Sequence, residues 1–226
     1  MPATHRTDIL QGLLDERHSC RAFLPQQLPR ETIERILCMA QQTASWCNAQ
    51  PWQVHVLSAD ATERARRALL QHVDAQAPQP DFAFPDAYLG VYSERRRECA
   101  WRLYAAVGVE RGDKAASAKQ TRENFRFFGA PHVAIVTSEA NLGTYGAVDC
   151  GAFVSNFMLA AQSMGVASIA QAALAAYSPF WHGHLGLAAD RKVVCGISFG
   201  HEDPDHPANT FRTARAGLAE VATWVD

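Results

Sequence analysis

The sequence predicts a single globular domain in which helices alternate with a small number of strands. Its 226 residues are typical of one domain, and 48% of them are hydrophobic while 19% are charged. At this length a folded chain buries about 70% of the surface that its unfolded form exposes, so the core needs no disulfide. No internal repeat and no linker between independent domains interrupts residues 1–226.

Strand patterns occur at three places. WQVHVLS (52–58) alternates between apolar and polar residues, while HVAIVTS (132–138) and KVVCGIS (192–198) are more continuously apolar. The proline-rich stretch QAPQPDFAFP (76–85) predicts a loop, and HEDPDHP (201–207) predicts a second break. These strands are expected to form the centre of the domain.

Helices are expected in the remaining regions, near residues 5–15, 30–42, 60–74 and 144–165, with a charged and mostly helical segment at 86–128. The second of these follows Pro29, which suits the first turn of a helix, and its apolar residues recur at intervals of three and four. In the fourth, the polar residues Asp149, Asn156 and Ser163 share one narrow face and the other residues are small or apolar. Burial of this helix on most sides requires either a partner subunit or a deep core within the chain.

Bulk charge and cysteine usage exclude several classes of protein. The formal net charge of −2 gives no general attraction to nucleic acid or anionic lipid. The first ten residues are too polar for a signal peptide, and no run of 18 apolar residues could cross a membrane. The six cysteines include no C-x-x-C pair, so free thiols in a cytoplasmic protein are favoured over a disulfide framework.

Familiar catalytic signatures are absent or incomplete. The sequence contains neither the G-x-G-x-x-G nor the G-x-x-x-x-G-K-[ST] loop, and its histidine pairs lack the further ligands of a metal site. Gly196–Gly200 fits the G-x-S-x-G pattern of serine hydrolases. However, two prolines follow where a helix is required, and the last histidine, His206, lies only eight residues after Ser198. A metal centre and a hydrolase are therefore both disfavoured.

Arginines near both ends of the chain suggest an anion site. Arg17 and Arg21 bracket Ser19, and Arg212 and Arg215 lie near the other end. On one face of a helix two guanidinium groups would repel each other, which raises the question of what stabilises the first pair. The planar fork of arginine suits phosphate oxygens, and a serine hydroxyl adds a hydrogen bond. Ordinary surface arginines are the alternative, and spacing alone favours it.

Several motifs occur together in the order typical of a known family. They are RHSCRAF (17–23), SWCNAQPW (45–52), FFGAPHV (127–133), MGVASIAQAAL (164–174), VVCGISFGHEDPDHPANTFRTAR (193–215) and the closing TW. From about residue 16 to 224 the chain resembles the FMN-dependent nitroreductases, most closely the branch of nitrobenzoate and similar nitroarene reductases. The resemblance implies an α+β fold, with a mixed central sheet surrounded by helices, in an intertwined homodimer. It also implies a helical lid at about 82–128 and two FMN sites at the subunit interface.

The resemblance assigns expected roles to individual residues. Arg17 and Ser19 are expected to bind the FMN phosphate, with His18 nearby, while Arg21 reaches the pyrimidine edge of the flavin and stabilises its reduced form. Ser45 and Asn48 are expected to line the ring, and Trp46 and Cys47, which depart from the usual pattern, to shape the mouth of the pocket. The backbone of four residues is also expected to contact the ring, with the N–H of Ala172 facing the hydride-accepting nitrogen: Ala170, Gln171, Ala172 and Ala173. Arg215 and Arg212 are expected to bind the phosphate.

The implied activity is that of an NAD(P)H oxidoreductase. FMN supplies the redox chemistry, and NAD(P)H and a nitroaromatic or quinone-like substrate bind in turn, with ping-pong kinetics. No side chain is identified as a general acid, and no metal is expected. The alternatives are a reductive dehalogenase or an oxygen-dependent flavin enzyme of the same fold, and an FMN-binding protein without turnover.

Overall fold

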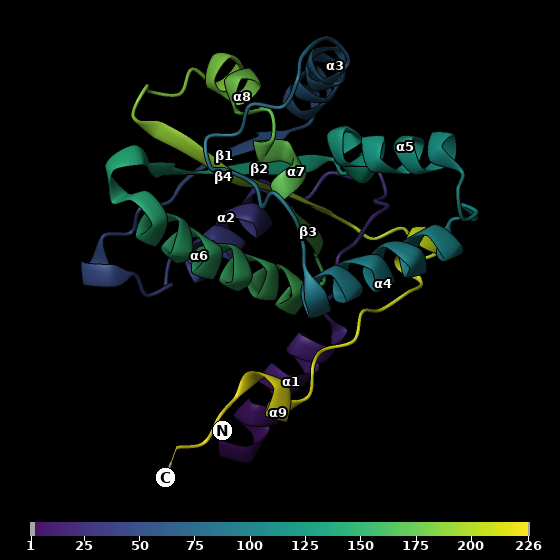
Figure 1. The fold of residues 1–226 in the computed structure, drawn as a ribbon. Coiled ribbons are helices and arrows are strands. Elements are labelled where there is room, and N and C mark those ends of the chain that lie inside the picture. Colours follow the sequence, from purple (N-terminus) through teal and green to yellow (C-terminus); the bar gives the residue numbers. More distant parts are fainter. Residues whose placement is uncertain (1–2, 226) are drawn as a thin grey trace.

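A four-stranded sheet forms the centre of the chain in the computed structural model, which describes residues 3–225 (Figure 1). Its strands are β1 (Gln53–Ser58), β2 (His132–Glu139), β3 (Ala167–Gln171) and β4 (Arg191–Gly200), in the order β1-β2-β4-β3. Each strand pairs with its neighbour in the antiparallel sense. The expectation of a mixed sheet is therefore corrected for this chain, since parallel pairing among the described residues is limited to isolated bridges such as Ser19 to Ser168. The alternation within a strand does not reveal the direction of its neighbour, which depends on the chain connections.

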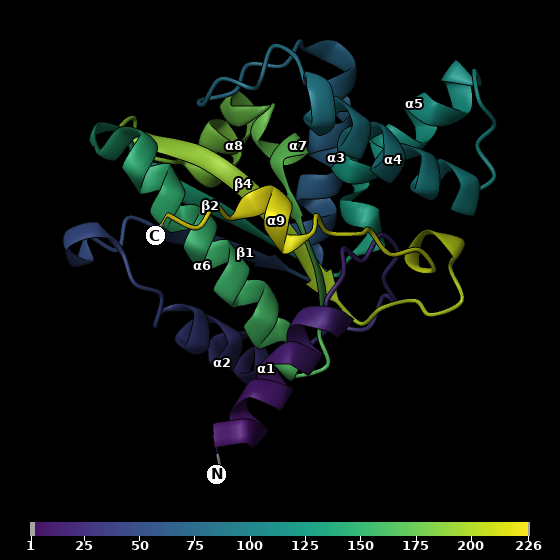
Figure 2. The same ribbon diagram turned by 60° about the horizontal axis from the view of Figure 1, so that its bottom comes forward.

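Helices cover both faces of the sheet (Figures 1 and 2). One layer consists of α2 (Arg30–Ala40) and α6 (Gly143–Ser163), and the opposite layer consists of α3 (Asp60–Ala75), α7 (Ala172–Ala175) and α8 (Ser178–Leu185). At the periphery lie α1 (Ala3–Glu16), α4 (Gly90–Ala106), α5 (Lys114–Arg122) and α9 (Leu218–Val221). Short 3-10 turns are η1 (Trp46–Asn48), η2 (Glu123–Gly129), η3 (Ala140–Leu142) and η4 (Pro207–Asn209).

Each face of the sheet has its own apolar cluster. Phe153 and Phe157 of α6 pack with Ile36 of α2 on one side, and Leu69 of α3 packs with Trp181 of α8 on the other. Strand β2 lies between the two clusters, and its residues from His132 to Ser138 are all buried. This double burial explains why its sequence is continuously apolar rather than alternating.

The expected helices and strands are confirmed, with boundaries that differ by a few residues. The segment expected to be helical at 86–128 consists of α4, α5 and η2, with a turn between the two helices. The sequence patterns predict neither β3 nor α8. Strand β3 is only five residues long, and its burial does not alternate. Helix α8 contains Pro179, His182 and Gly183, which obscure a helical repeat.

Helix α6 is buried on one face only. Cys150, Phe153 and Phe157 lie in the core, whereas Tyr145 is 61% exposed and Val148 is 59% exposed. The core within the chain therefore covers one face of α6 and leaves Tyr145 and Val148 exposed on another face. Among the described residues, no helix, α6 included, is long and apolar enough to cross a membrane.

A buried histidine joins three segments of the fold. The ring of His132, which is 1% exposed, stacks on Phe199 at 5.2 Å between ring centroids. Its Nε2 accepts the N–H of Leu28 at 2.9 Å, and its Nδ1 lies 2.8 Å from the Ser58 hydroxyl. Since a backbone N–H only donates, Nε2 carries no proton and Nδ1 donates to Ser58. Burial, together with the nearby His201, lowers the pKa of this neutral imidazole to about 4.

We expect this histidine to make the fold sensitive to acid. Between the ordinary histidine pKa of 6.5 and the folded value of about 4, the unfolded chain binds more protons than the folded one. Stability should therefore fall with falling pH across this window, by up to about 3 kcal/mol in total. Urea unfolding at a series of pH values measures this loss.

The variant His132→Gln should show a flatter dependence of unfolding free energy on pH, whatever its absolute stability. The matched control is His5→Gln, since His5 is exposed, and this change should leave the slope as in the wild type. Equal slopes for His132→Gln and the wild type would contradict the assignment.

Candidate functional site

The segment that follows α1 is extended, not helical. Helix α1 ends at Glu16, and Arg17 to Arg21 continue as an extended chain along the edge of β3. Successive side chains of an extended segment point to opposite sides, so Arg17, Ser19 and Arg21 share one face while His18 and the fully buried Cys20 share the other. The Cα atoms of the two arginines are then about 13 Å apart.

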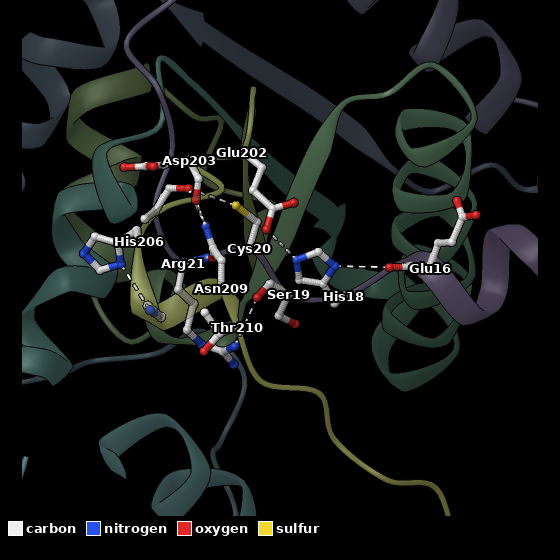
Figure 3. A network of polar contacts seen from close by, with 12 residues as sticks. Glu16, His18, Ser19, Cys20, Arg21, Glu202, Asp203, His206, Asn209 and Thr210 are labelled. Carbon is white, nitrogen blue, oxygen red and sulfur yellow. Dashed lines mark hydrogen bonds and ion pairs between the residues drawn. The ribbon is translucent and has the colours of Figure 1, made fainter. Parts of the chain in front are cut away.

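Hydrogen bonds fix this segment to β3 and to η4. Cys20 donates its N–H to the Ser168 carbonyl at 3.2 Å, and Arg21 donates its N–H to Asn209 Oδ1 at 2.7 Å. The Asn209 amide also donates to the carbonyls of Ala22 and Asp203, each at 2.9 Å (Figure 3). Asn209 is 4% exposed, so these bonds form in a dry environment where they are not replaced by water. The two ends of the chain are thereby held together.

The ring of His18 has partners within the chain, although the residue also borders the cavity between the arginines. Its Nδ1 lies 3.1 Å from the Glu16 carbonyl, and its Nε2 lies 3.0 Å from Glu202 Oε1 (Figure 3). Both ring nitrogens thus have acceptors within the chain. A contribution of His18 to anion binding therefore has to come from its backbone N–H.

A cavity of about 260 Å³ lies against the face formed by Arg17, Ser19 and Arg21. Arg212 and Arg215 close its other wall, and Asp15 is its one carboxylate. Four guanidinium groups therefore face a single carboxylate, which itself accepts a hydrogen bond from Gln11 at 2.9 Å. The cavity is strongly positive.

Electrostatics within this cavity are unfavourable without an anion. Burial, with Arg215 nearby, lowers the pKa of Arg17, and burial lowers the pKa of Arg21. Across the described residues 3–225, the Arg17 guanidinium forms no hydrogen bond or ion pair. Arg21 donates to the Ser19 carbonyl at 3.1 Å and lies over the Phe211 ring at 5.3 Å. A phosphate monoester has the charge and the acceptor oxygens to relieve this repulsion.

Arg212 and Arg215 are held less firmly. The Arg212 guanidinium donates to the carbonyls of Asn209 and Phe211, and that of Arg215 donates to the backbone and hydroxyl of Thr213. These are local contacts on an exposed segment after η4. Both side chains line the cavity, and Arg215 is the one whose charge acts on Arg17.

A second cavity of about 260 Å³ begins on the other side of Arg21. Its wall includes the backbone and methyl groups of residues 170–173, opposite Tyr104 of α4 and Gln120 of α5. The Gln171 side chain points into the protein, where it accepts from the Ser198 hydroxyl and donates to the Asn124 carbonyl at 2.9 Å. This wall is therefore smooth and presents main-chain groups. Arg21 lines both cavities and joins them into one elongated site.

Ser45 and Asn48 lie far from this site. The N–H of Trp46 in η1 donates to Asp149 near the start of α6, whereas Gln162 near the end of α6 contacts Glu16, next to Arg17. Thirteen residues of helix separate Asp149 from Gln162, a rise of about 20 Å. A single chain does not bring Ser45 and Asn48 to the arginines. Cys47 and Asn48 both have positive φ angles, 52° and 54°, a conformation that asparagine tolerates and that is strained for cysteine.

The competing sites suggested by the sequence are not formed. Ser198 of the G-x-S-x-G pattern is fully buried and donates to Gln171, so it cannot act as an exposed nucleophile. Within the described part of the chain, no group of three His, Cys, Asp or Glu residues has the arrangement of a metal site. The cavity lined by Arg17, Arg21, Arg212 and Arg215 is therefore the candidate site.

Sequence reasoning did not identify Asn209, Glu202 or Tyr104 as parts of the site. Asn209 and Glu202 act through partners more than 180 positions away, at Arg21 and His18, so no local pattern indicates them. Tyr104 lies in a charged helix whose aromatic residues are indistinguishable by spacing.

Comparisons with known proteins give one consistent result. A model of the nitroreductase family matches residues 14–201. Nitroreductase NfnB of Mycolicibacterium smegmatis is 35% identical over 228 residues, covering 99% of this chain and 97% of that protein, and a 4-nitrobenzoate reductase of Pseudomonas putida is 33% identical over 211 residues, covering 92% of each. The crystal structure of FMN-dependent NfnB from Mycobacterium smegmatis in complex with NADPH aligns with a TM-score of 0.93 and 34% identity, covering 98% of this chain and 100% of that one. Arg212 and Arg215 lie beyond the segment that the family model matches.

We expect inorganic phosphate to stabilise the protein through the arginine cavity. At ten times its dissociation constant, a ligand specific to the folded state contributes about 1.4 kcal/mol. For a chain of this size, the midpoint of thermal unfolding should rise by about 3–6 °C. Differential scanning calorimetry with and without phosphate, at constant ionic strength, measures the shift.

Arg17→Gln and Arg215→Gln should each reduce this phosphate-dependent shift. Arg35→Gln is the matched control, because Arg35 is an exposed arginine on α2 outside the cavity, and its shift should equal that of the wild type. A shift that survives both cavity substitutions would mean that phosphate binds elsewhere.

Proposed function

The chain belongs to the nitroreductase family, and on that premise we propose that it is an FMN-dependent NAD(P)H oxidoreductase that reduces nitroaromatic or similarly electron-poor compounds. Its relatives include a 4-nitrobenzoate reductase, and a similar structure is an FMN-dependent nitroreductase in complex with NADPH. The observation that carries the proposal is the elongated site in which Arg21 joins a cavity lined by four arginines to a wall formed by residues 170–173.

The residues of this site fit FMN. In our proposal Arg17, Ser19 and Arg215 bind the phosphate, whose charge offsets the guanidinium repulsion described above. Arg212 acts there only after its guanidinium releases the carbonyls of Asn209 and Phe211. The isoalloxazine ring then lies beyond Arg21, against the backbone of residues 170–173.

FMN, when bound, supplies hydride transfer from NAD(P)H to the oxidant, and the chain supplies position and charge. Arg21 is the residue that we assign to the pyrimidine edge of the flavin. Its half-buried guanidinium is held between the Ser19 carbonyl and the Phe211 ring, so it is oriented before the ligand binds. A fixed positive charge in a partly dry site favours the flavin form that carries more negative charge. We assign no side chain as a general acid.

We further propose that the active protein is a homodimer in which the partner subunit supplies Ser45 and Asn48. The exposed apolar face of α6 requires a cover, as do Leu218, Val221 and Trp224 of the carboxyl-terminal segment, which are between 68% and 80% exposed. A second copy would cover these surfaces and deliver η1 to the flavin, which one chain cannot do over about 20 Å. We place the protein in the cytoplasm, where a reducing environment suits its six free cysteines.

The direct test is the colour and the turnover of the purified protein. It should be yellow with bound FMN, lose that colour with NADPH under anaerobic conditions, and regain it on addition of nitrobenzene. Steady-state rates should follow ping-pong kinetics. Yellow protein that NADPH and NADH both fail to bleach would indicate FMN binding without turnover. Bleached protein that only oxygen or a halophenol reoxidises would indicate a different reaction on the same fold.

Replacement of Arg21 should change the redox potential of the flavin. One charge-assisted hydrogen bond is worth about 1.5–3 kcal/mol, and roughly 30 mV corresponds to 1.4 kcal/mol for two electrons. Arg21→Met should therefore lower the midpoint potential of bound FMN by about 30–60 mV. An anaerobic dye titration measures it, with Arg35→Met as the control, and an unchanged potential with FMN still bound rules out this role.

Disruption of the exposed face of α6 should separate the subunits. Val148→Asp places a charge on a surface that is already exposed in one chain, so the fold should survive while the dimer does not. Light scattering should report a monomer, and FMN affinity should fall because Ser45 and Asn48 of the partner are lost. Ala115→Asp on the exposed side of α5 is the control, and a Val148→Asp protein that stays dimeric would contradict this interface.

A further inference from the structure

A third cavity, of about 860 Å³, lies next to the proposed flavin site. It opens between α3, α5, η2 and the segment that follows β4. Helix α3 lies on the side of the sheet away from α6 (Figure 1). The cavity therefore does not coincide with the proposed dimer face, and its volume suits a ligand of cofactor size.

Two cations in this cavity have no partner. Five cationic side chains and three carboxylates line it. Arg66 pairs with Glu63, and Arg126 pairs with Glu123 at 3.3 Å, so these four charges are matched within the wall. By contrast, Arg67 of α3 and Lys119 of α5 form no hydrogen bond or ion pair with any described residue. Two free cations from different helices thus face the same space.

The other charges near the cavity do not neutralise this pair. The remaining carboxylate, Asp203, accepts the N–H of Asp205 at 3.1 Å, and the remaining cation, Arg21, belongs to the flavin site. Removing the matched pairs leaves Arg67, Lys119 and Arg21 against Asp203 alone. The cavity is suited to an anion that has at least two negative charges.

The cavity is continuous with the space assigned to the flavin ring. Arg21, Gln120 and Phe128 line both. On its other side, the space assigned to the flavin ring borders the arginine cavity, in which the FMN phosphate binds in our proposal. A dinucleotide whose nicotinamide contacts the ring therefore has this large cavity available for its other end.

We propose that this cavity binds the adenosine end of NADPH, with Arg67 and Lys119 contacting its 2′-phosphate, and that the enzyme therefore prefers NADPH to NADH. This inference rests on the proposed function. NADH has a hydroxyl group where NADPH has the phosphate, so only NADPH forms charge-assisted hydrogen bonds with the two free cations. The cavity thereby selects NADPH over NADH through contacts far from the nicotinamide ring that transfers the hydride.

The test compares the two nicotinamides in the FMN-loaded enzyme. With nitrobenzene as oxidant, Arg67→Gln and Lys119→Gln should each lower kcat/KM for NADPH roughly tenfold, the effect of one charge-assisted hydrogen bond. The kcat/KM for NADH should stay within about twofold of the wild type, because the lost contact is made only by the 2′-phosphate of NADPH.

Binding of 2′,5′-ADP gives a second readout that needs no turnover. Calorimetric titration of the holoenzyme should show tighter binding of 2′,5′-ADP than of 5′-ADP, and each substitution should remove this difference. Arg64→Gln and Lys114→Gln are the matched controls on α3 and α5. Both side chains lie outside the cavity and form no hydrogen bond or ion pair with the described residues, and both variants should behave as the wild type.

Several outcomes would overturn the inference. One is a wild-type enzyme that does not prefer NADPH, and another is an equal loss with both nicotinamides. A carboxylate on the substrate offers similar chemistry, so a third is a variant that keeps its NADPH preference and loses preference for 4-nitrobenzoate over nitrobenzene. If neither nicotinamide bleaches the flavin, the proposed function fails, while the comparison of 2′,5′-ADP with 5′-ADP still decides whether the cavity is a phosphate subsite.

Discussion

The burial of two guanidinium groups on a segment that the fold holds in place is the constraint on which the site depends. The extended segment from Arg17 to Arg21 is held by β3 on one side and by the buried Asn209 on the other, so the backbone of both arginines is fixed. Burial lowers the pKa of both, and Arg215 adds to the effect at Arg17. A site of this kind is unfavourable when empty, and an anion both fills it and joins the two ends of the chain.

Arg21 connects the parts of the proposed site, because it lines all three cavities. One cavity suits a phosphate, the next presents a flat main-chain wall, and the largest carries two unmatched cations. The three spaces follow one another as the parts of a bound flavin and its reductant would. The same chain leaves one face of α6 and its carboxyl-terminal apolar residues uncovered, and in our proposal η1 of a second copy completes the site. Assembly and cofactor binding are therefore coupled in this account.

The residue types of the site can be read from the amino-acid sequence more readily than its geometry. The family resemblance assigns Arg17, Ser19 and Arg21 to a cofactor site, whereas their spacing alone favours ordinary surface arginines, and their alternation suits the extended chain that forms once α1 ends at Glu16. The central strands are predictable because β2 is buried on both faces. Asn209 and the short strand β3 are not, since their roles come from pairings with distant segments. The expected place of Ser45 and Asn48 beside the flavin cannot be tested in one chain, because in our proposal it depends on how two chains meet.

The ³¹P resonance of bound FMN tests the central claim most directly. A free phosphate monoester loses its second proton with a pKa near 6, so its chemical shift changes between about pH 5 and 8. Bound beside Arg17 and Arg215, the phosphate should stay dianionic, and its resonance should not move across this range. A bound phosphate that titrates as it does in free FMN would show that these arginines do not hold it, and would contradict the account.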